Sequence, residues 1–125
     1  MDKLDDRALS EVARYFAALA VPMRLKILNA LRDGERKVGE LTELTGCTQA
    51  NVSKHLAILA QGGFVQRHAR GTSVYYRIAD SRLFRLCDMV CGRIGERYAK
   101  QADLEHMFAV SGAGKGRAAA GARRR

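Results

Sequence analysis

The residues from 48 to 59 combine hydrogen-bonding side chains with the apolar spacing of a helix. Val52, Leu56 and Leu59 recur at three- and four-residue intervals, which predicts one buried helix face. Six of these twelve residues carry amide, hydroxyl, imidazole or ammonium groups and none carries an acid, a mixture that suits base edges and the phosphates beside them. An ordinary solvated face of an amphipathic helix is the alternative. The residues with this chemistry are Thr48, Gln49, Asn51, Ser53, Lys54 and His55.

Cys87 and Cys91 form a second candidate for chemistry. They are four residues apart in an expected helix, so their thiols share one face about a turn from each other. Two thiolates at that spacing can bind a soft centre such as As(III), Sb(III) or Hg(II). Cys47, or a cysteine of a second copy of the chain, could supply a third sulfur. Oxidation to a disulfide between subunits is a further route, and nearby arginines favour the reactive thiolate.

Both cysteines also fit plain helix packing, because a buried cysteine behaves as a small hydrophobe. Three interpretations therefore remain open: sensing of a thiophilic metal or metalloid, redox or reactive-sulfur sensing, and a structural role. Cys47 lies in a turn and fits a bystander as well as a ligand. An odd number of cysteines argues against a structural disulfide framework.

Four helices are expected before the middle of the chain. Asp5 or Asp6 can cap a first helix to about Leu19, and Pro22 suits the first position of a second, largely buried helix. A short third helix begins at about Val38 and is closed by a glycine. Thr48 then caps the helix of residues 48–59, and two short helices around a tight glycine turn predict a helix-turn-helix.

The pattern changes to strands after Gly62-Gly63. Residues 64–69 and 73–78 are β-rich runs separated by Arg70-Gly71-Thr72, and Gly71 supplies the positive φ that a hairpin needs. Three arginines suit contact with phosphates or the minor groove, although a solvated basic hairpin is the alternative. These wing candidates are Arg67, Arg70 and Arg77. The fold class expected is mainly α with a β-hairpin wing, a winged helix-turn-helix.

Asp80 or Ser81 is expected to cap a long last helix that ends at about Phe108. Long helices at both ends of a small domain leave apolar surface that its own core cannot cover. We therefore expect a homodimer that forms through the N- and C-terminal helices.

Composition indicates one small basic domain. The chain has 125 residues, 22 Lys and Arg against 13 Asp and Glu, and a net charge of +9. Residues 1–110 are expected to hold the DNA-binding and dimerisation domain, and 111–125 a disordered basic tail. The acidic start lacks the pattern of a signal peptide, and no apolar run suits a membrane span, so a cytoplasmic location without membrane contact is expected.

Four stretches in order resemble the ArsR/SmtB family of bacterial winged-helix repressors. Residues 19–28, LAVPMRLKIL, resemble the opening of that family's second helix, and 38–41, VGEL, its third helix. Residues 48–59, TQANVSKHLAIL, resemble its recognition helix, and 71–78, GTSVYYRI, the second strand of its wing. Together they cover roughly residues 15–95.

The resemblance implies a homodimer on a palindromic double-stranded DNA operator, which it leaves when an inducer binds. Gln49 and Asn51 would then contact base edges, and Ser53 and Lys54 phosphates, whereas His55 either contacts DNA or packs against its own domain. No obligatory cofactor is expected. The metal sites of the family are not matched, because Arg82 and Arg93 stand where its last-helix zinc site needs ligands and Lys37-Val38-Gly39 replaces its Cys-x-Cys.

Two other functions compete with an inducible repressor. An enzyme is not favoured, because the sequence has no phosphate-binding glycine loop, Cys-x-x-Cys, nucleophile elbow or metal-binding histidine pair. A DNA-binding regulator without an inducer, with structural cysteines only, remains as the second alternative.

Overall fold

The computed structural model describes residues 3–99 and residue 107 of the chain. The described residues belong to two compact units, the first ending at Asp80 and the second beginning at Ser81. The basic tail expected at 111–125 and the end of the last helix expected near Phe108 lie outside the described residues. No helix among the described residues is long and apolar enough to cross a membrane.

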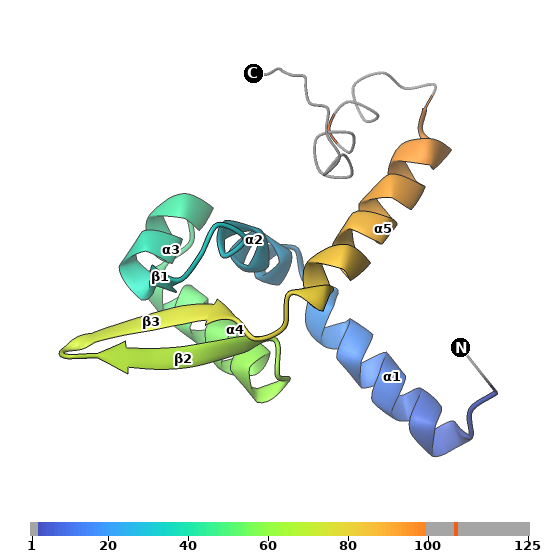
Figure 1. Ribbon diagram of the computed structural model, residues 1–125, viewed down its shortest axis with the longest axis horizontal. Coiled ribbons are helices and arrows are strands. Elements are labelled where there is room, and N and C mark those ends of the chain that lie inside the picture. The colour runs from blue at the N-terminus through green and yellow to red at the C-terminus, as the bar shows by residue number, and fades with distance from the viewer. Residues whose placement is uncertain (1–2, 100–106, 108–125) are drawn as a thin grey trace. The chain divides into compact units, whose positions relative to one another are not determined.

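The first unit has the expected winged helix-turn-helix order of elements (Figure 1). Its elements are α1 (Asp6–Leu19), α2 (Pro22–Ala30), β1 (Arg36–Lys37), α3 (Val38–Thr45), α4 (Gln49–Gln61), β2 (Val65–Arg70) and β3 (Ser73–Ile78). The predicted starts of the first two helices are confirmed. Asp5 caps α1 by accepting a hydrogen bond from the Ala8 N–H at 2.8 Å, and Pro22 is the first residue of α2.

The turn between α3 and α4 is built from local hydrogen bonds. Gly46 has a left-handed backbone with φ of 72°, and its N–H donates to the Thr42 carbonyl at 3.0 Å. The Thr48 hydroxyl oxygen accepts from the Asn51 N–H at 3.2 Å and so caps α4 as predicted. The buried Thr45 hydroxyl donates to the Leu41 carbonyl at 2.7 Å, which satisfies its polar group inside the core.

The sheet has three antiparallel strands in the order β1-β3-β2, one more than the sequence predicts. β1 pairs Arg36 with Tyr76 and Lys37 with Tyr75, but two residues are too short to show a strand pattern in a sequence. The hairpin turn is also tighter than expected. Arg70 is the last residue of β2 and pairs with Ser73, which leaves a two-residue turn with Gly71 at φ of 60°.

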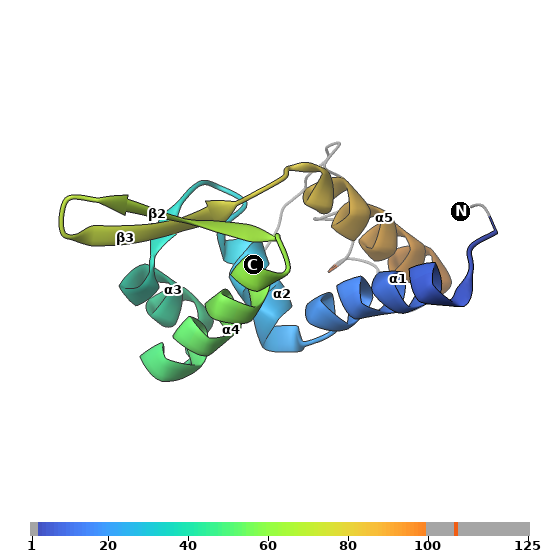
Figure 2. The same ribbon diagram turned by 90° about the horizontal axis from the view of Figure 1, so that it is seen from below.

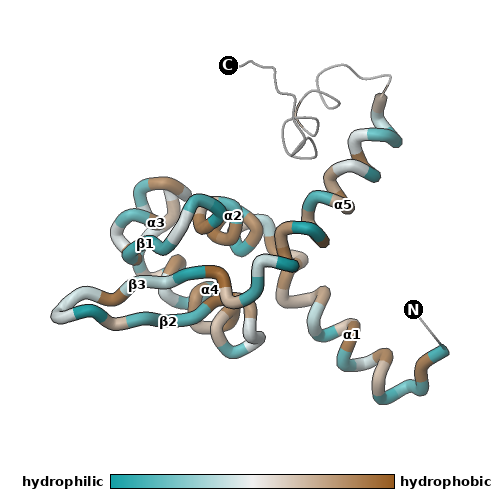
Figure 3. The backbone as a smooth tube through the Cα atoms, viewed as in Figure 1, coloured by the Kyte–Doolittle hydropathy of each residue, from teal (hydrophilic) through white to brown (hydrophobic). Residues whose placement is uncertain are grey.

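An aliphatic core joins α2, α3 and α4 beneath one face of the sheet, and Figure 2 shows both α3 and α4 on the same side of the β2–β3 hairpin. Its fully buried side chains are Ile27, Leu41, Val52, Leu56 and Leu59. Hydrophobic residues accordingly concentrate along α2 and α4 (Figure 3). The prediction that α2 is largely buried is only partly correct, because Leu25 is 44% exposed. One side of α2 is buried against α3 and α4, and the other side is exposed to solvent.

The second unit contains α5 (Arg82–Arg97), with Ser81 at its N-cap. The Ser81 side chain makes no capping hydrogen bond, and Tyr98 is the C-cap of the helix. Gly92 and Gly95 lie in its last two turns, where glycine lowers helix stability. Leu83 is buried, whereas Met89 and Val90 are exposed.

Replacing Leu41 by alanine is expected to lower the free energy of unfolding by about 2–5 kcal/mol, because buried methyl groups are lost and a cavity remains. The matched change Leu44→Ala on the same helix removes a side chain that is 53% exposed. It is expected to cost less than about 0.5 kcal/mol. Urea unfolding of both variants at one protein concentration measures the difference, and equal losses would contradict the placement of α3.

Candidate nucleic-acid interface

The core contacts of α4 determine which of its side chains face solvent. Val52, Leu56 and Leu59 are fully buried, so the remaining sides of the helix are turned outward. Four of the predicted contact residues are exposed there: Gln49, Asn51, Ser53 and Lys54. Thr48 is exposed too, although its oxygen already accepts the capping hydrogen bond, so its O–H is the group left to donate.

Helical spacing sorts these side chains into two rows. Gln49 and Ser53 are four residues apart, and Asn51 is followed by Lys54 and His55 at three and four residues. Ala50 and Ala57 lie between the rows, and both are exposed. Their small side chains would let the helix axis approach a nucleic-acid groove closely, a feature that the hydrogen-bonding residues alone do not indicate. Alanine can also contact a thymine methyl group.

His55 differs from the other predicted contacts because it is half-buried and has a partner inside the protein. Its Nδ1 accepts a hydrogen bond from the Arg24 Nε at 3.2 Å. Desolvation lowers the pKa of His55 below its ordinary value of 6.5, and the positive charges of Arg24 and Lys54 lower it further. The neutral ring that results carries its proton on Nε2, because Nδ1 is the acceptor.

The wing arginines do not lie on one face. Residues that pair across antiparallel strands share a face of the sheet, and neighbours along a strand alternate. Arg67 pairs with Tyr76 and therefore shares the face of Val65, which is buried. Arg70 and Arg77 lie on the opposite face. The sequence suggested one group of three arginines, but the strand register places Arg67 on one face of the hairpin and Arg70 and Arg77 on the other.

The opposite face of the sheet also holds partners for its two arginines. Arg70 forms an ion pair with Glu35, and its guanidinium lies 4.2 Å from the centre of the Tyr75 ring. Lys37 Nζ lies 5.6 Å from the same ring. Arg77 Nε donates to the Gln66 side-chain oxygen at 3.2 Å. Glu35 and Lys37 were missed by the sequence analysis, because only the pairing of β1 with β3 brings them to the wing.

The three cysteines are half-buried. None of Cys47, Cys87 and Cys91 is in a disulfide. Cys87 and Cys91 lie one turn apart on α5 as predicted, and Cys47 lies in the turn before α4. Among the residues that the structure describes, no group of three His, Cys, Asp or Glu side chains is placed to hold a metal ion. A third sulfur ligand remains a prediction.

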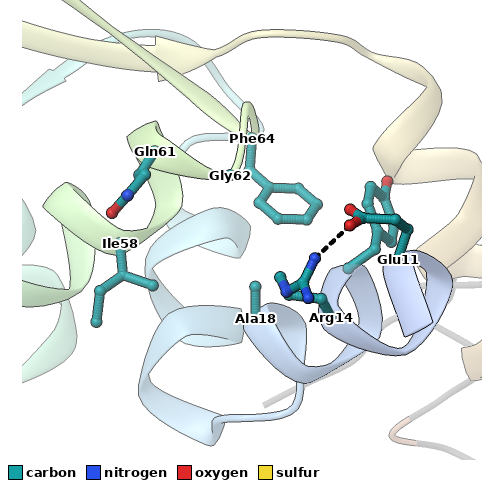
Figure 4. A pocket seen from close by; sticks show the side chains of 8 residues that line it. Glu11, Arg14, Ala18, Ile58, Gln61, Gly62 and Phe64 are labelled. Atoms are coloured by element: carbon teal, nitrogen blue, oxygen red, sulfur yellow. Dashed lines mark hydrogen bonds and ion pairs between the residues drawn. The ribbon is translucent and has the colours of Figure 1, made fainter. Parts of the chain in front are cut away.

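A cavity of about 570 Å³ lies between α1 and the end of α4 (Figure 4). Its lining residues are Glu11, Arg14, Tyr15, Ala18, Ile58, Gln61, Gly62 and Phe64. Arg14 pairs with Glu11 at 2.5 Å, and the Tyr15 and Phe64 ring centres are 4.7 Å apart. A Cβ on Gly62 would come within 2.9 Å of the Phe64 ring, which explains the glycine at this helix end.

Comparison with known proteins gives a family for this arrangement. Residues 22–67, from α2 into the wing, match the family model of bacterial regulatory proteins of the arsR family. The chain is also 39% identical over 85 residues to the transcriptional regulator NmtR of Mycobacterium tuberculosis, covering 68% of this chain and 71% of that protein. The chain belongs to the ArsR family. This confirms the resemblance and the fold class that the sequence predicts.

Two further proteins are similar to this chain. A probable mercury resistance operon repressor of Streptomyces lividans is 41% identical over 71 residues, which are 57% of each protein. The solution structure of a homodimeric winged helix-turn-helix DNA-binding domain of Mycobacterium bovis is 40% identical, with a TM-score of 0.62 over 72% of this chain and 86% of that one. The relatives are regulators, which favours the prediction that this ArsR-family protein is not an enzyme.

His55 is expected to make the stability of the fold depend on pH. Because its pKa is lowered in the folded protein, the unfolded chain takes up the proton first as the pH falls. The contribution of neutral His55 is complete above its ordinary pKa of 6.5 and is lost as the pH falls from there towards the lower folded value. Urea unfolding between pH 7.5 and 5 is therefore expected to show a larger loss for the wild type than for His55→Gln. Parallel curves would contradict the assignment.

Proposed function

We propose that this ArsR-family protein is a homodimeric, sequence-specific repressor that binds a double-stranded DNA operator. The observation that carries the proposal is the acid-free outer surface of α4, where donors and acceptors stand in two rows around exposed alanines. The likeness to a homodimeric DNA-binding domain supports both the partner and the assembly. The net charge of +9 suits a polyanion.

Large apolar side chains that are exposed in the single chain support the proposed dimer. Leu9, Tyr15 and Phe16 of α1 are between 43% and 50% exposed, and Met89 and Val90 of α5 are 72% and 49% exposed. Exposed apolar surface on a small domain is removed from water when two copies associate. We propose that α1 and α5 form the interface between the subunits.

Two copies of α4 would then enter successive major grooves, with half-sites about 34 Å apart. In this arrangement Gln49 and Asn51 contact base edges, because a side-chain amide can pair with adenine through both of its polar atoms. Ser53 and Lys54 contact phosphates and set the register. The wing arginines contact the flanking backbone or minor groove. Arg67 does so from one face of the hairpin, and Arg70 and Arg77 from the other.

Replacing Asn51 by alanine is expected to weaken operator binding by about 1–3 kcal/mol and to relax the base preference at one position of each half-site. The same change at Asn29, an exposed residue of α2, is the matched control and is expected to leave binding unchanged. Fluorescence anisotropy with an operator library measures both. An Asn51→Ala protein with wild-type affinity and specificity would remove α4 from the proposed interface.

We further propose that Cys87 and Cys91 form the inducer site and that a thiophilic ion such as Hg(II), As(III) or Sb(III) releases the operator when it binds them. Their half-buried thiols one turn apart on α5 support a two-thiolate site. The mercury resistance operon repressor among the relatives supports this class of inducer. α5 also carries part of the proposed dimer surface, so an ion bound there would act on the interface between subunits.

Titration of the operator complex with Hg(II) or arsenite is expected to release the wild-type protein but neither Cys87→Ser nor Cys91→Ser. Cys47→Ser is the control and is expected to respond like the wild type if two sulfurs of α5 suffice. Loss of release in Cys47→Ser would instead make Cys47 the third ligand. Release by polysulfide or peroxide alone would favour the redox alternative, and normal release from both α5 variants would refute the two-thiol site.

A further inference from the structure

We propose that Arg24 is a positioning residue of the DNA interface, which holds His55 in the neutral tautomer whose Nε2–H donates to a DNA phosphate. The inference rests on the proposed function, because it assigns a role to a residue that lies behind the DNA-facing surface of α4. Arg24 lies on α2, whereas none of the predicted DNA contacts lies on that helix.

Arg24 connects three helices through one guanidinium group. Its Nε donates to His55 Nδ1 on α4 at 3.2 Å, and its Nη1 donates to the Ala18 carbonyl of α1 at 3.0 Å. Ala18 lies in the last turn of α1, where backbone carbonyls lack a partner within the helix. The same positive charge is favourable at the C-terminal end of a helix. The guanidinium group is therefore held by two hydrogen bonds, and both are partly buried.

The chemistry of these two groups determines the tautomer. A guanidinium group has only donors and does not lose its proton in proteins, so the ring nitrogen facing it must be an acceptor. His55 is therefore neutral while the contact exists, with its proton on Nε2. A second proton on Nδ1 would place an N–H and a positive charge against Arg24. Lys54, the other nearby cation, opposes that proton as well.

The position of His55 explains why a fixed donor is useful there. His55 follows Asn51 by four residues and Lys54 by one, so it continues the row that we assign to DNA. A neutral imidazole can carry its proton on either of its two nitrogens. Once Nδ1 accepts the hydrogen bond from Arg24, only Nε2 can carry the proton and donate it. The hydrogen bond from Arg24 thus selects the nitrogen that donates to the phosphate, just as a hydrogen bond to the other ring nitrogen fixes the tautomer of a metal-bound histidine.

The tautomer can be tested without DNA. The chain has three histidines, and His55→Ala identifies the signals of His55 in long-range ¹H–¹⁵N spectra of the full chain. The wild type is expected to show His55 as the Nε2–H tautomer at pH 7.5. Arg24→Lys and Arg24→Gln are expected to show a mixture of tautomers, and Arg24→Gln also a raised pKa of His55. Identical spectra of His55 in all three proteins would overturn the proposal.

Operator binding tests the positioning role. Arg24→Lys retains the charge but not the two directed donors, and it is expected to lose affinity by about tenfold with an unchanged salt slope. Lys26→Gln, on the exposed side of the same helix, is the control for a lost charge and is expected to retain affinity within about twofold. In a His55→Ala background Arg24→Lys is expected to have no further effect, because the two residues act as one unit.

Three results would contradict the inference. Wild-type affinity of Arg24→Lys would show that charge suffices, as in a direct phosphate contact, and an equal loss in the His55→Ala background would show that Arg24 acts independently. Unfolding of both Arg24 variants, seen as lost amide dispersion, would make the residue a stability element. Failure of the wild type to bind any operator would instead refute the proposed function, while the tautomer measurement would still stand.

Discussion

Burial of one aliphatic face of α4 is the constraint on which the rest of the structure depends. Val52, Leu56 and Leu59 contribute side chains with no exposed surface, and hydrophobic burial of this kind is the dominant favourable term in folding. It also fixes the rotation of the helix about its axis. Once these three positions face the core, Asn51 and Lys54 must face outward. The packing that stabilises the fold thus also sets which side chains of α4 face solvent, and the proposed DNA contacts are among them.

The sheet adds a second constraint that acts through pairing rather than burial. Antiparallel register decides which arginines share a face, and the two-residue β1 strand places Lys37 beside Tyr75. Glu35 pairs with Arg70 on that side, so the wing carries an acid that balances one of its cations. An exposed pair of this kind contributes little to stability. Its consequence is positional, because it orients the Arg70 guanidinium beside Glu35 and the Tyr75 ring.

Regulation, in the proposal, belongs to a separate unit of the chain. Cys87 and Cys91 lie on α5, which follows the winged unit and exposes Met89 and Val90. An ion that binds both thiolates on α5 can affect α4 only by changing the interface between the two subunits. Arg24 joins the C-terminal end of α1 to His55, so it provides a physical contact between a proposed dimer helix and the row of α4 residues that we propose to face DNA.

The sequence by itself determined the winged helix-turn-helix, its caps at Asp5 and Thr48, and the exposed row on α4, because these follow from local periodicity and from side chains that bond within a few residues. Tertiary structure alone decided the β1 pairing, the separation of Arg67 from Arg70, and the partner of His55. The physical reason is sequence distance. Arg24 and His55 are 31 residues apart, and their contact exists only where α2 and α4 pack together.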